Sequence, residues 1–340
     1  MIKHLKIENF KSIKRLETDC KRINILIGEP NSGKSNFLES LAVFAYCYAN
    51  TLHDLVRFEK VRELFFDQNI EEAIRVETDS FSYEIRSRSP RPVPQKIPFV
   101  TTIAPTGLPG HFFLIFNDRE KDSQLIFDND GNDKTMGGCV YFSTIRPYVF
   151  PARGTGDAGS TESYLWPPHG NNLPSVLMTH PKLWETAADM VQKHGIKLVL
   201  RQHEGKIGLL KEKGGRVALW PYRALSDTLQ RLIFYFAAIE TNKDATLLLE
   251  EPESHAFPYY TKFLGETIAR DSSNQYFIAT HNPYFLFSII EKAPKEDLNV
   301  LITHLENEET RIKQLDEKGI DRAFDFDSSI FFNLEELINE

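Results

Sequence analysis

The chain has 340 residues, of which 41% are hydrophobic and 26% are charged, and its formal net charge is −8. This composition indicates a folded protein of one large domain or two ordinary ones, and it excludes a uniformly basic nucleic-acid coat protein. The negative net charge still allows a local basic face, because only the surface that meets phosphate has to be positive. No apolar run is long enough for a transmembrane helix, and the start of the chain lacks an apolar signal core, so we expect no membrane association.

The cysteines are few and widely spaced, at positions Cys20, Cys47 and Cys139. This spacing argues against a disulfide framework or a zinc site. It predicts a reducing compartment, the cytoplasm.

The first elements alternate between strand and helix patterns. Ile2–Asn9 alternates polar and apolar residues and predicts a strand, and the apolar run Arg22–Ile27 predicts a buried strand. A glycine-containing segment, Gly28–Ser35, leads from that strand into an apolar helix predicted over Lys34–Tyr48. Three further elements are predicted before position 87: a helix over Leu52–Phe66 and strands over Ala73–Glu77 and Ser80–Arg86.

The pattern between positions 87 and 220 is less regular and predicts an inserted α+β segment. Its start, Arg86–Pro98, is rich in proline and basic residues, which suits a solvated connector, a phosphate contact or a partner contact. The predicted elements are strands at His111–Asn117 and Gly137–Ile145, a hairpin over Ser123–Asp133, a loop over Pro147–Pro174, a helix over Pro181–Lys193, and paired strands at Ile196–Gln202 and Lys206–Glu212.

After Trp220 strands and helices alternate again, which predicts a parallel sheet. The expected elements are an apolar helix starting at Ser226, a buried strand over Ala245–Glu253 that ends in acidic residues, a helix over Tyr259–Arg270, a strand over Asn274–Pro283 and a helix over Tyr284–Glu291. We therefore predict an α/β core formed by residues 1–86 and 221–340, with residues 87–220 inserted into it.

The segment Gly28–Ser35 matches the phosphate-loop motif G-x-x-x-x-G-K-[ST] at every fixed position. Two glycines permit a tight loop whose N–H groups point at phosphate oxygens, Lys34 supplies a positive charge to the β and γ phosphates, and Ser35 offers a hydroxyl to Mg²⁺. The strand before it and the helix after it are the context that this motif requires. The sequence therefore predicts an ATP and Mg²⁺ site.

Two carboxylates and a histidine follow predicted strands. Glu250 and Glu251 end an apolar strand, where ligands bind in open α/β sheets, and adjacent strand residues point to opposite faces. One carboxylate can therefore join the metal shell while the other reaches a water molecule. His281 ends the next strand, and Ser226 with Asp227 opens a helix whose N-terminus could hold an anion.

These features, in this order, resemble the ABC-type ATPases of the SMC/RecF/OLD-like branch. The matching segments are Ile7–Glu17, Leu26–Leu41, Ala224–Leu232, Leu247–Pro258 and Ile278–Pro283, with Pro167–Leu177 similar to a segment of stand-alone OLD-like ATPases. The resemblance implies a P-loop NTPase of the ABC head type, with a mixed sheet core, a helical lobe and an inserted irregular α+β segment.

The resemblance also implies a homodimer that sandwiches ATP, in which Ser226 of one copy reaches the γ-phosphate held by the other. Glu251 would polarise the attacking water, His281 would orient it, and Gln68 would join the metal shell with Ser35 and Glu250. Thr228 replaces the glycine expected after Asp227, which predicts slow turnover. The expected nucleotide-binding residues are Gly28, Glu29, Pro30, Asn31, Ser32, Gly33, Lys34, Ser35, Asn36, Ser226 and Asp227, and the expected catalytic residues are Lys34, Glu251 and His281.

Two other motifs fail their context. Gly154–Gly159 matches G-x-G-x-x-G but is followed by no apolar helix, and Asp128–Asp133 begins like a calcium loop but lacks the required glutamate.

Two functions stay open. The first is a DNA-associated clamp or motor in DNA repair or anti-phage defence, and the second is a slow nucleotide-gated scaffold that holds a separate effector protein, a nuclease or toxin. The net charge and the lack of a coiled coil favour the scaffold, whereas the basic connector favours DNA.

Overall fold

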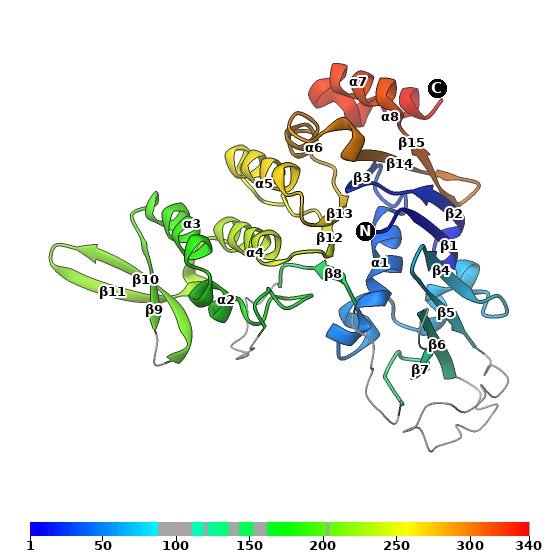
Figure 1. Cartoon of the computed structure of the whole chain (residues 1–340), viewed down its shortest axis with the longest axis horizontal. Coiled ribbons are helices and arrows are strands. Elements are labelled where there is room, and N and C mark those ends of the chain that lie inside the picture. The colour runs from blue at the N-terminus through cyan, green and yellow to red at the C-terminus, as the bar shows by residue number, and fades with distance from the viewer. Residues whose placement is uncertain (88–110, 119–121, 136–142, 152–161, 202–203, 340) are drawn as a thin grey trace.

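The computed structural model of the chain describes residues 1–87, 111–118, 122–135, 143–151, 162–201 and 204–339. They form two six-stranded sheets with a helix between them, a layer of helices on the outer side of one sheet, and a three-stranded arm that projects from the helical side (Figure 1). No helix in these ranges is both long enough and apolar enough to cross a bilayer.

The central sheet is mixed and carries the predicted parallel strands. Its order is β15-β14-β3-β13-β12-β8, in which β15 is the antiparallel edge strand. The strands are β3 (Ile23–Gly28), β8 (Ile145–Tyr148), β12 (Thr246–Glu250), β13 (Gln275–Ala279), β14 (Leu298–Glu306) and β15 (Glu309–Gln314). The prediction of a P-loop α/β core is confirmed.

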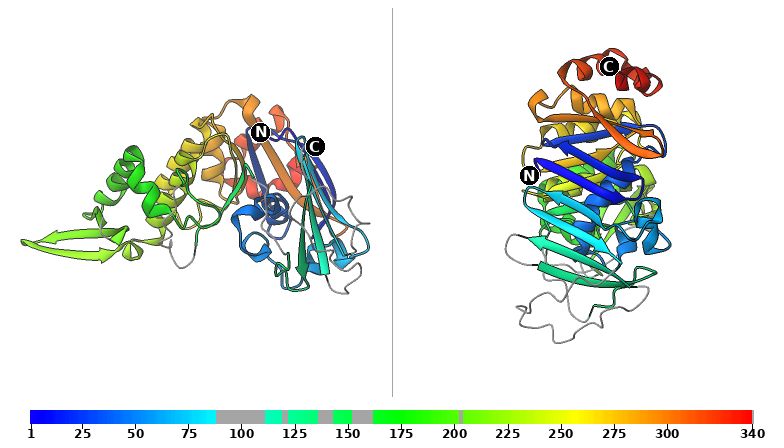
Figure 2. Two further views of the ribbon diagram at one scale, coloured as in Figure 1. Left: turned by 60° about the horizontal axis from the view of Figure 1, so that its bottom comes forward. Right: turned by 90° about the vertical axis from the view of Figure 1, so that its right-hand side faces the viewer.

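Apolar side chains cover both faces of this sheet, as expected for buried parallel strands. On β12, Leu247 and Leu249 face one hydrophobic cluster and Leu248 faces the other. The first cluster includes α4 (Asp227–Thr241), α5 (Pro258–Arg270) and α6 (Pro283–Ile290), and the second includes α1 (Lys34–Ala42). Helix α1 therefore lies between the two sheets, and the other three helices form the outer layer (Figures 1 and 2).

The second sheet is antiparallel, with the order β2-β1-β4-β5-β6-β7. Its strands are β1 (His4–Phe10), β2 (Ile13–Asp19), β4 (Ile74–Thr78), β5 (Phe81–Arg86), β6 (His111–Asp118) and β7 (Asp122–Asp128). Its apolar face packs on α1 and on the 3-10 helix Val43–Tyr48 that continues it, where the rings of Phe44 and Tyr83 meet edge to face with their centroids 4.9 Å apart.

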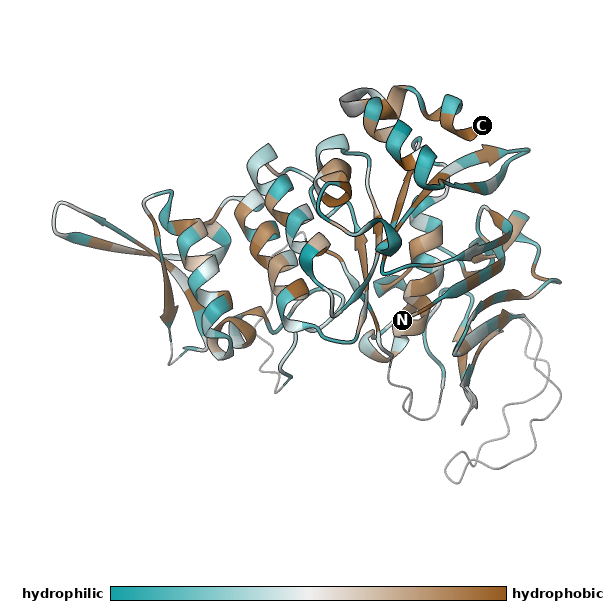
Figure 3. Cartoon of the chain, turned by 45° about the horizontal axis from the view of Figure 1, so that its top comes forward, coloured by the Kyte–Doolittle hydropathy of each residue, from teal (hydrophilic) through white to brown (hydrophobic). Residues whose placement is uncertain are grey.

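The arm follows α2 (Leu173–Thr179) and α3 (Pro181–Gln192) and consists of β9 (Lys197–Arg201), β10 (Lys206–Lys213) and β11 (Arg216–Pro221). Strand β11 is an edge strand, and all six of its residues are exposed. Figure 3 shows hydrophobic residues along the arm, far from the core. The chain ends in α7 (Glu317–Asp325) and α8 (Leu334–Ile338).

Several predicted elements differ from the structure. The helix expected over Lys34–Tyr48 is α-helical only to Ala42 and continues as a 3-10 helix over Val43–Tyr48. The helix expected over Leu52–Phe66 is wrong, because this segment forms short 3-10 turns. Its backbone is paired elsewhere: Val61 N–H donates to Asn129 O (2.9 Å) and Leu64 O accepts from Lys11 N–H (2.8 Å). These tertiary bonds outweigh the helical spacing of its apolar residues.

Other differences concern residues 87–220. Of the strand expected over Gly137–Ile145, residues 137–142 lie outside the described ranges, and β8 begins at Ile145. The connector residues 88–98 and the Gly154–Gly159 motif also lie outside them. Strands β6 and β7 extend the antiparallel sheet, β8 joins the central sheet, and β9–β11 form the arm. The domain limits at 87 and 220 stay a prediction, although this segment contributes strands to every sheet.

Candidate active site

The carboxyl ends of three neighbouring parallel strands meet at one edge of the central sheet. Glu250 of β12 pairs in register with Ala279 of β13, and Ala279 pairs with Leu26 of β3. The loops that follow these strands therefore carry the phosphate-loop motif, the paired glutamates and the histidine to the same edge. This is the position at which open α/β sheets bind ligands.

The phosphate loop is held tightly from behind. Gly28 has φ +154° and Gly33 has φ +100°, and a Cβ on either would overlap a threonine, Thr303 behind Gly28 and Thr310 behind Gly33. The Ser32 hydroxyl bonds to the Thr303 hydroxyl (2.5 Å) and is buried. Both glycines are thus required by backbone conformation and by space.

Lys34, the first residue of α1, curls back over this loop. Its Nζ donates to Gly28 O (2.8 Å) and Glu29 O (2.7 Å). Partial burial lowers the pKa of Lys34 from its ordinary value, while the carboxylates of Glu251, Glu250 and Glu29 act in the opposite direction. The ammonium group therefore lies against the backbone of the loop, and its contact with the β and γ phosphates stays a prediction.

Some of the other residues of the motif line a cavity, and others anchor the loop to neighbouring elements. A cavity of about 340 Å³ opens beside the loop and is lined by Asn31, Gly33, Lys34, Ser35, Asn36 and Arg57. Glu29 and Pro30 lie exposed on the loop, and the Asn36 side chain donates to Ser12 Oγ (2.7 Å). The Ser32 and Asn36 side chains thus anchor the motif to Thr303 and Ser12, and the Ser32 N–H donates to Glu29 O (3.3 Å) within the loop.

Ser35 and Glu250 meet directly. The Ser35 hydroxyl donates to Glu250 Oε1, and Arg57 Nη2 donates to the same oxygen (3.2 Å). Arg57 Nε also donates to Glu39 Oε1 (2.6 Å), and Lys11 Nζ donates to the second oxygen of Glu39. A hydroxyl beside a carboxylate is an all-oxygen donor pair of the kind that Mg²⁺ accepts, so the residues present fit that ion.

Glu251 and His281 form the second pair at this edge. His281 Nδ1 lies 2.9 Å from Glu251 Oε1, and the Ser254 hydroxyl donates to Glu251 Oε2 (3.0 Å). The His281 side chain is 61% exposed and that of Glu251 is 41% exposed, so solvent reaches both. Glu251 has φ +44°, an uncommon conformation for a residue with a side chain. Its N–H still pairs with Ala279 O (2.9 Å), so the strained turn is held by the neighbouring strand.

Ser226 and Asp227 lie at the start of α4. Ser226 is the N-cap, its Oγ accepting from Leu229 N–H (3.4 Å), and Asp227 pairs with Arg231 at 3.8 Å. In the described part of the chain no hydrogen bond or ion pair joins either residue to the phosphate loop. Thr228, which stands where glycine was expected, donates to His255 O (2.8 Å) and so ties the helix start to the loop after β12.

A family model described as "AAA ATPase domain" matches residues 1–107, and one described as "AAA domain, putative AbiEii toxin, Type IV TA system" matches residues 142–286. No curated protein matches the chain. Among solved structures, an SMC head bound to the C-terminal winged-helix domain of ScpA matches with a TM-score of 0.52 and 13% identity, over 94% of this chain and 99% of that chain.

The chain has the fold of an SMC head domain. Two other SMC heads are also similar. The Pyrococcus furiosus head, bound to the C-terminal domain of ScpA, has a TM-score of 0.49 and 13% identity and covers 95% of this chain and 98% of its own. The Thermotoga maritima head has a TM-score of 0.42 and 15% identity and covers 93% and 99%.

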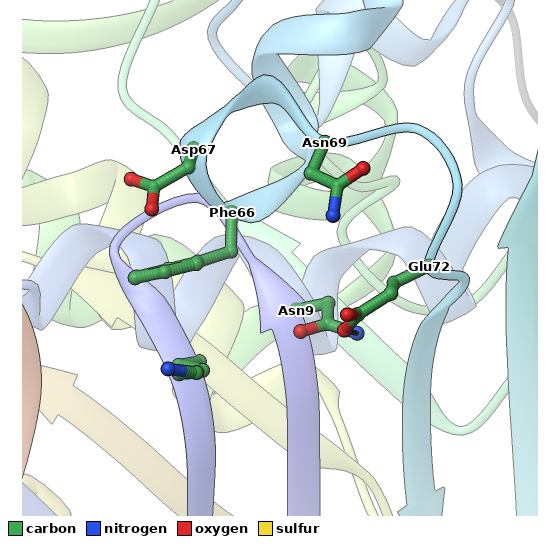
Figure 4. Close-up of a pocket in the computed structure, with 6 residues that line it drawn as sticks. Asn9, Phe66, Asp67, Asn69 and Glu72 are labelled. Atoms are coloured by element: carbon green, nitrogen blue, oxygen red, sulfur yellow. Dashed lines mark hydrogen bonds between the residues drawn. The ribbon is translucent and has the colours of Figure 1, made fainter.

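Gln68 lies in another part of the fold. It ends the 3-10 turn Phe66–Gln68, next to a separate cavity of about 200 Å³ lined by Asn9, Lys14, Phe66, Asp67, Asn69 and Glu72. Figure 4 shows Asn9 and Glu72 side by side in this cavity, where Asn9 Nδ2 donates to Glu72 Oε2 (3.2 Å). Within the described ranges no hydrogen bond joins Gln68 to Ser35 or Glu250, so its metal role stays a prediction.

Sequence reasoning missed the cations beside the phosphate loop. Arg57 belongs to a segment predicted as an ordinary helix, and Lys11 belongs to the turn between β1 and β2. Their meeting at Glu39 depends on the packing of the antiparallel sheet against α1, which no local motif records. The only available signal was Lys11 itself, which lies in the Ile7–Glu17 segment that resembled the family.

Replacing Arg57 by alanine tests its part in the cavity. We expect Arg57→Ala to weaken ATP binding about tenfold, about 1.4 kcal/mol, because a charged donor is lost beside the phosphates. Isothermal titration with Mg²⁺ and ATP measures the effect. Arg62→Ala, an exposed arginine of the adjacent turn, is the matched control. Equal affinities for the two variants would show that Arg57 does not face the nucleotide.

Proposed function

We propose that this SMC-like head binds and hydrolyses ATP, and that two copies sandwich the nucleotide. The observation that carries the proposal is the meeting of Lys34, the Ser35–Glu250 pair and the Glu251–His281 pair at one edge of the central sheet. A positive charge, a metal-ligand pair and a positioned base are the parts that phosphoryl transfer requires.

Each group has a distinct task in this proposal. Lys34 and the loop N–H groups hold the β and γ phosphates, and Ser35 and Glu250 hold Mg²⁺, which neutralises phosphate charge. Glu251 accepts a proton from water as the water oxygen bonds to the γ-phosphorus and the bond to the β–γ bridging oxygen breaks. His281, 2.9 Å from Glu251, keeps the carboxylate directed at that water.

The second copy is proposed because one chain leaves the γ-phosphate side incomplete. Ser226 caps a fifteen-residue helix whose N-terminus attracts anions, and in its own chain it contacts no residue of the phosphate loop within the described ranges. A partner's Ser226 would supply that contact. Slow turnover is expected, since Thr228 fixes the helix start to His255.

The output that we propose is a DNA-associated clamp or motor, in DNA repair or anti-phage defence, which closes on ATP binding and reopens on hydrolysis. The support is the fold that the chain shares with an SMC head, together with a local excess of basic residues, which is what a contact with phosphate requires. Basic residues outnumber acidic ones on the arm, where Lys197, Lys211 and Arg216 are exposed.

A second output is favoured by the arm itself. Val217, Leu219 and Trp220 of β11 are 60%, 62% and 53% exposed, and one edge of this strand is unpaired in the sheet. Exposed apolar residues on an open edge suit a protein partner. The head would then be a nucleotide-gated scaffold for a separate effector, a nuclease or toxin. The second family model, whose description names a toxin, supports the same alternative.

Lys34→Ala tests the phosphate loop. We expect the variant to lose ATP binding at micromolar concentrations, a loss of about 3 kcal/mol or more, because the charge that meets two phosphates is removed. A fluorescent ATP analogue reports the affinity, and Lys60→Ala, whose Nζ bonds to Asp130 outside the cavity, is the control. Retained ATP affinity would refute the assignment of the loop.

Glu251→Gln tests the general base. We expect ATP binding to persist while kcat falls about 100-fold or more, because the amide cannot accept the proton. ATP should also convert the variant into a stable dimer, measured by light scattering. Normal hydrolysis by this variant would remove Glu251 from the mechanism, and a monomer with bound ATP would remove the sandwich.

The two outputs separate in one assay. A clamp or motor should hydrolyse ATP several times faster with duplex DNA than without it. A scaffold should be indifferent to DNA and should hold a protein from its native cell, most firmly as the Glu251→Gln variant. Leu219→Lys should release that protein without changing the ATPase rate, because Leu219 is remote from the site in the fold. An ATP hydrolysis rate that duplex DNA raises in both the wild type and Leu219→Lys would favour the clamp.

A further inference from the structure

Glu253 is a carboxyl group that the proposed reaction does not use, and it is buried. It lies in the turn after β12, two residues beyond Glu251, and is only 3% exposed. Its Oε1 accepts from the Thr280 hydroxyl at 2.5 Å, and its Oε2 is buried without a hydrogen-bond partner among the described residues. Few native carboxylates are left in this condition, because burying an unpaired charge is costly.

The bond to Thr280 joins the two loops that carry the proposed base and histidine. Thr280 directly precedes His281, and its hydroxyl also accepts from the N–H of Asn282 (3.0 Å), which is the N-cap of α6. The exposed Glu251–His281 bond is the other side-chain link between these loops that the structure shows. Of the two links, the Glu253–Thr280 bond is the buried one, which water does not weaken.

The surroundings of Glu253 favour its neutral form. The ionisable groups that act on it are Glu251 in its own loop, which repels a negative charge, and His281 at the end of β13. Glu253 also acts electrostatically on the Tyr235 hydroxyl of α4, and burial raises the pKa of that hydroxyl. Burial raises the pKa of Glu253 itself to about 7, with Thr280 and His281 working against that change.

We propose that Glu253 is a positioning residue, whose neutral carboxyl ties the turn after β12 to the end of β13 and so holds Glu251 against His281. When Glu253 ionises, a buried charge faces Glu251 and its Oε2 lacks a donor. The turn then moves to reach water, and the Glu251–His281 geometry is lost. This inference rests on the proposed ATP hydrolysis, and it predicts that hydrolysis declines as pH rises through the neutral range.

The test compares the pH dependence of kcat in the full chain. We expect wild-type kcat to fall about tenfold between pH 6.5 and pH 8.5, because the neutral carboxyl is then largely lost. Glu253→Gln, which keeps the shape without the charge, should remove most of that decline while leaving the KM for ATP unchanged. Glu240→Gln is the matched control, since burial also raises the pKa of this α4 carboxyl, on a helix that carries neither loop.

A second variant and a second readout keep the proposal open to refutation. Thr280→Val should lower kcat at every pH with little change in KM, because the buried link is cut. The hydrogen-exchange protection factors of the amides of residues 251, 253, 254 and 280–282, from which the intrinsic rise of exchange with pH is divided out, should fall above pH 7 in the wild type and not in Glu253→Gln. The sign follows from linkage, since a carboxyl whose pKa is raised on folding stabilises the fold less as pH rises.

The outcomes distinguish the two proposals. A wild-type chain that hydrolyses no ATP at any pH would overturn the proposed function, and the exchange experiment alone would then decide the role of Glu253. A Glu253→Gln variant with the same alkaline decline and the same exchange as wild type would overturn the positioning role. So would a folded Glu253→Gln variant that is inactive throughout, because the neutral side chain would then not be sufficient.

Discussion

The parallel pairing of β3, β13 and β12 places the phosphate loop, Glu250, Glu251 and His281 at one edge of the sheet. Their register puts Leu26, Ala279 and Glu250 side by side, so the loops that follow begin at one edge of the sheet. This register is firmly specified, because both faces are buried and a slip of one residue would exchange Leu248 with its neighbours across the sheet. The catalytic geometry is therefore a consequence of core packing, and Glu251 keeps its strained backbone because the strand beside it holds its N–H.

Charge is concentrated where the sheet ends. Lys34, Arg57 and Lys11 face Glu39, Glu250 and Glu251 across the phosphate loop, and hydrogen bonds join several of them. Charged groups lose hydration when they pack together, and only close partners of opposite charge compensate for the free energy of that loss. Glu253 is the exception, because it is buried beside the site with one oxygen unpaired, and its neutral form relieves that cost.

Local patterns predicted the elements that carry the strongest signals. Four predicted elements are present near their expected positions: the phosphate loop, the apolar helix from Ser226, the strand ending at Glu250 and the strand before His281. Each of them combines a clear pattern of residue types with a residue that marks where the element begins or ends. The pattern failed over Leu52–Phe66, where helical spacing was overridden by bonds to Asn129 and Lys11. It also missed β11 and the C-terminal strands β14 and β15, the second of which lies behind the phosphate loop.

The sequence alone determined the kinds of chemistry, because the residue types and spacing of a phosphate loop, an acidic strand end and a strand-end histidine are local properties. Only the tertiary structure decided which groups meet. The Ser35–Glu250 bond, the Glu251–His281 contact, the presence of Arg57 at the cavity and the burial of Glu253 join residues far apart along the chain. Their proximity depends on sheet register and on packing against α1, and neither is written in any short stretch of residues.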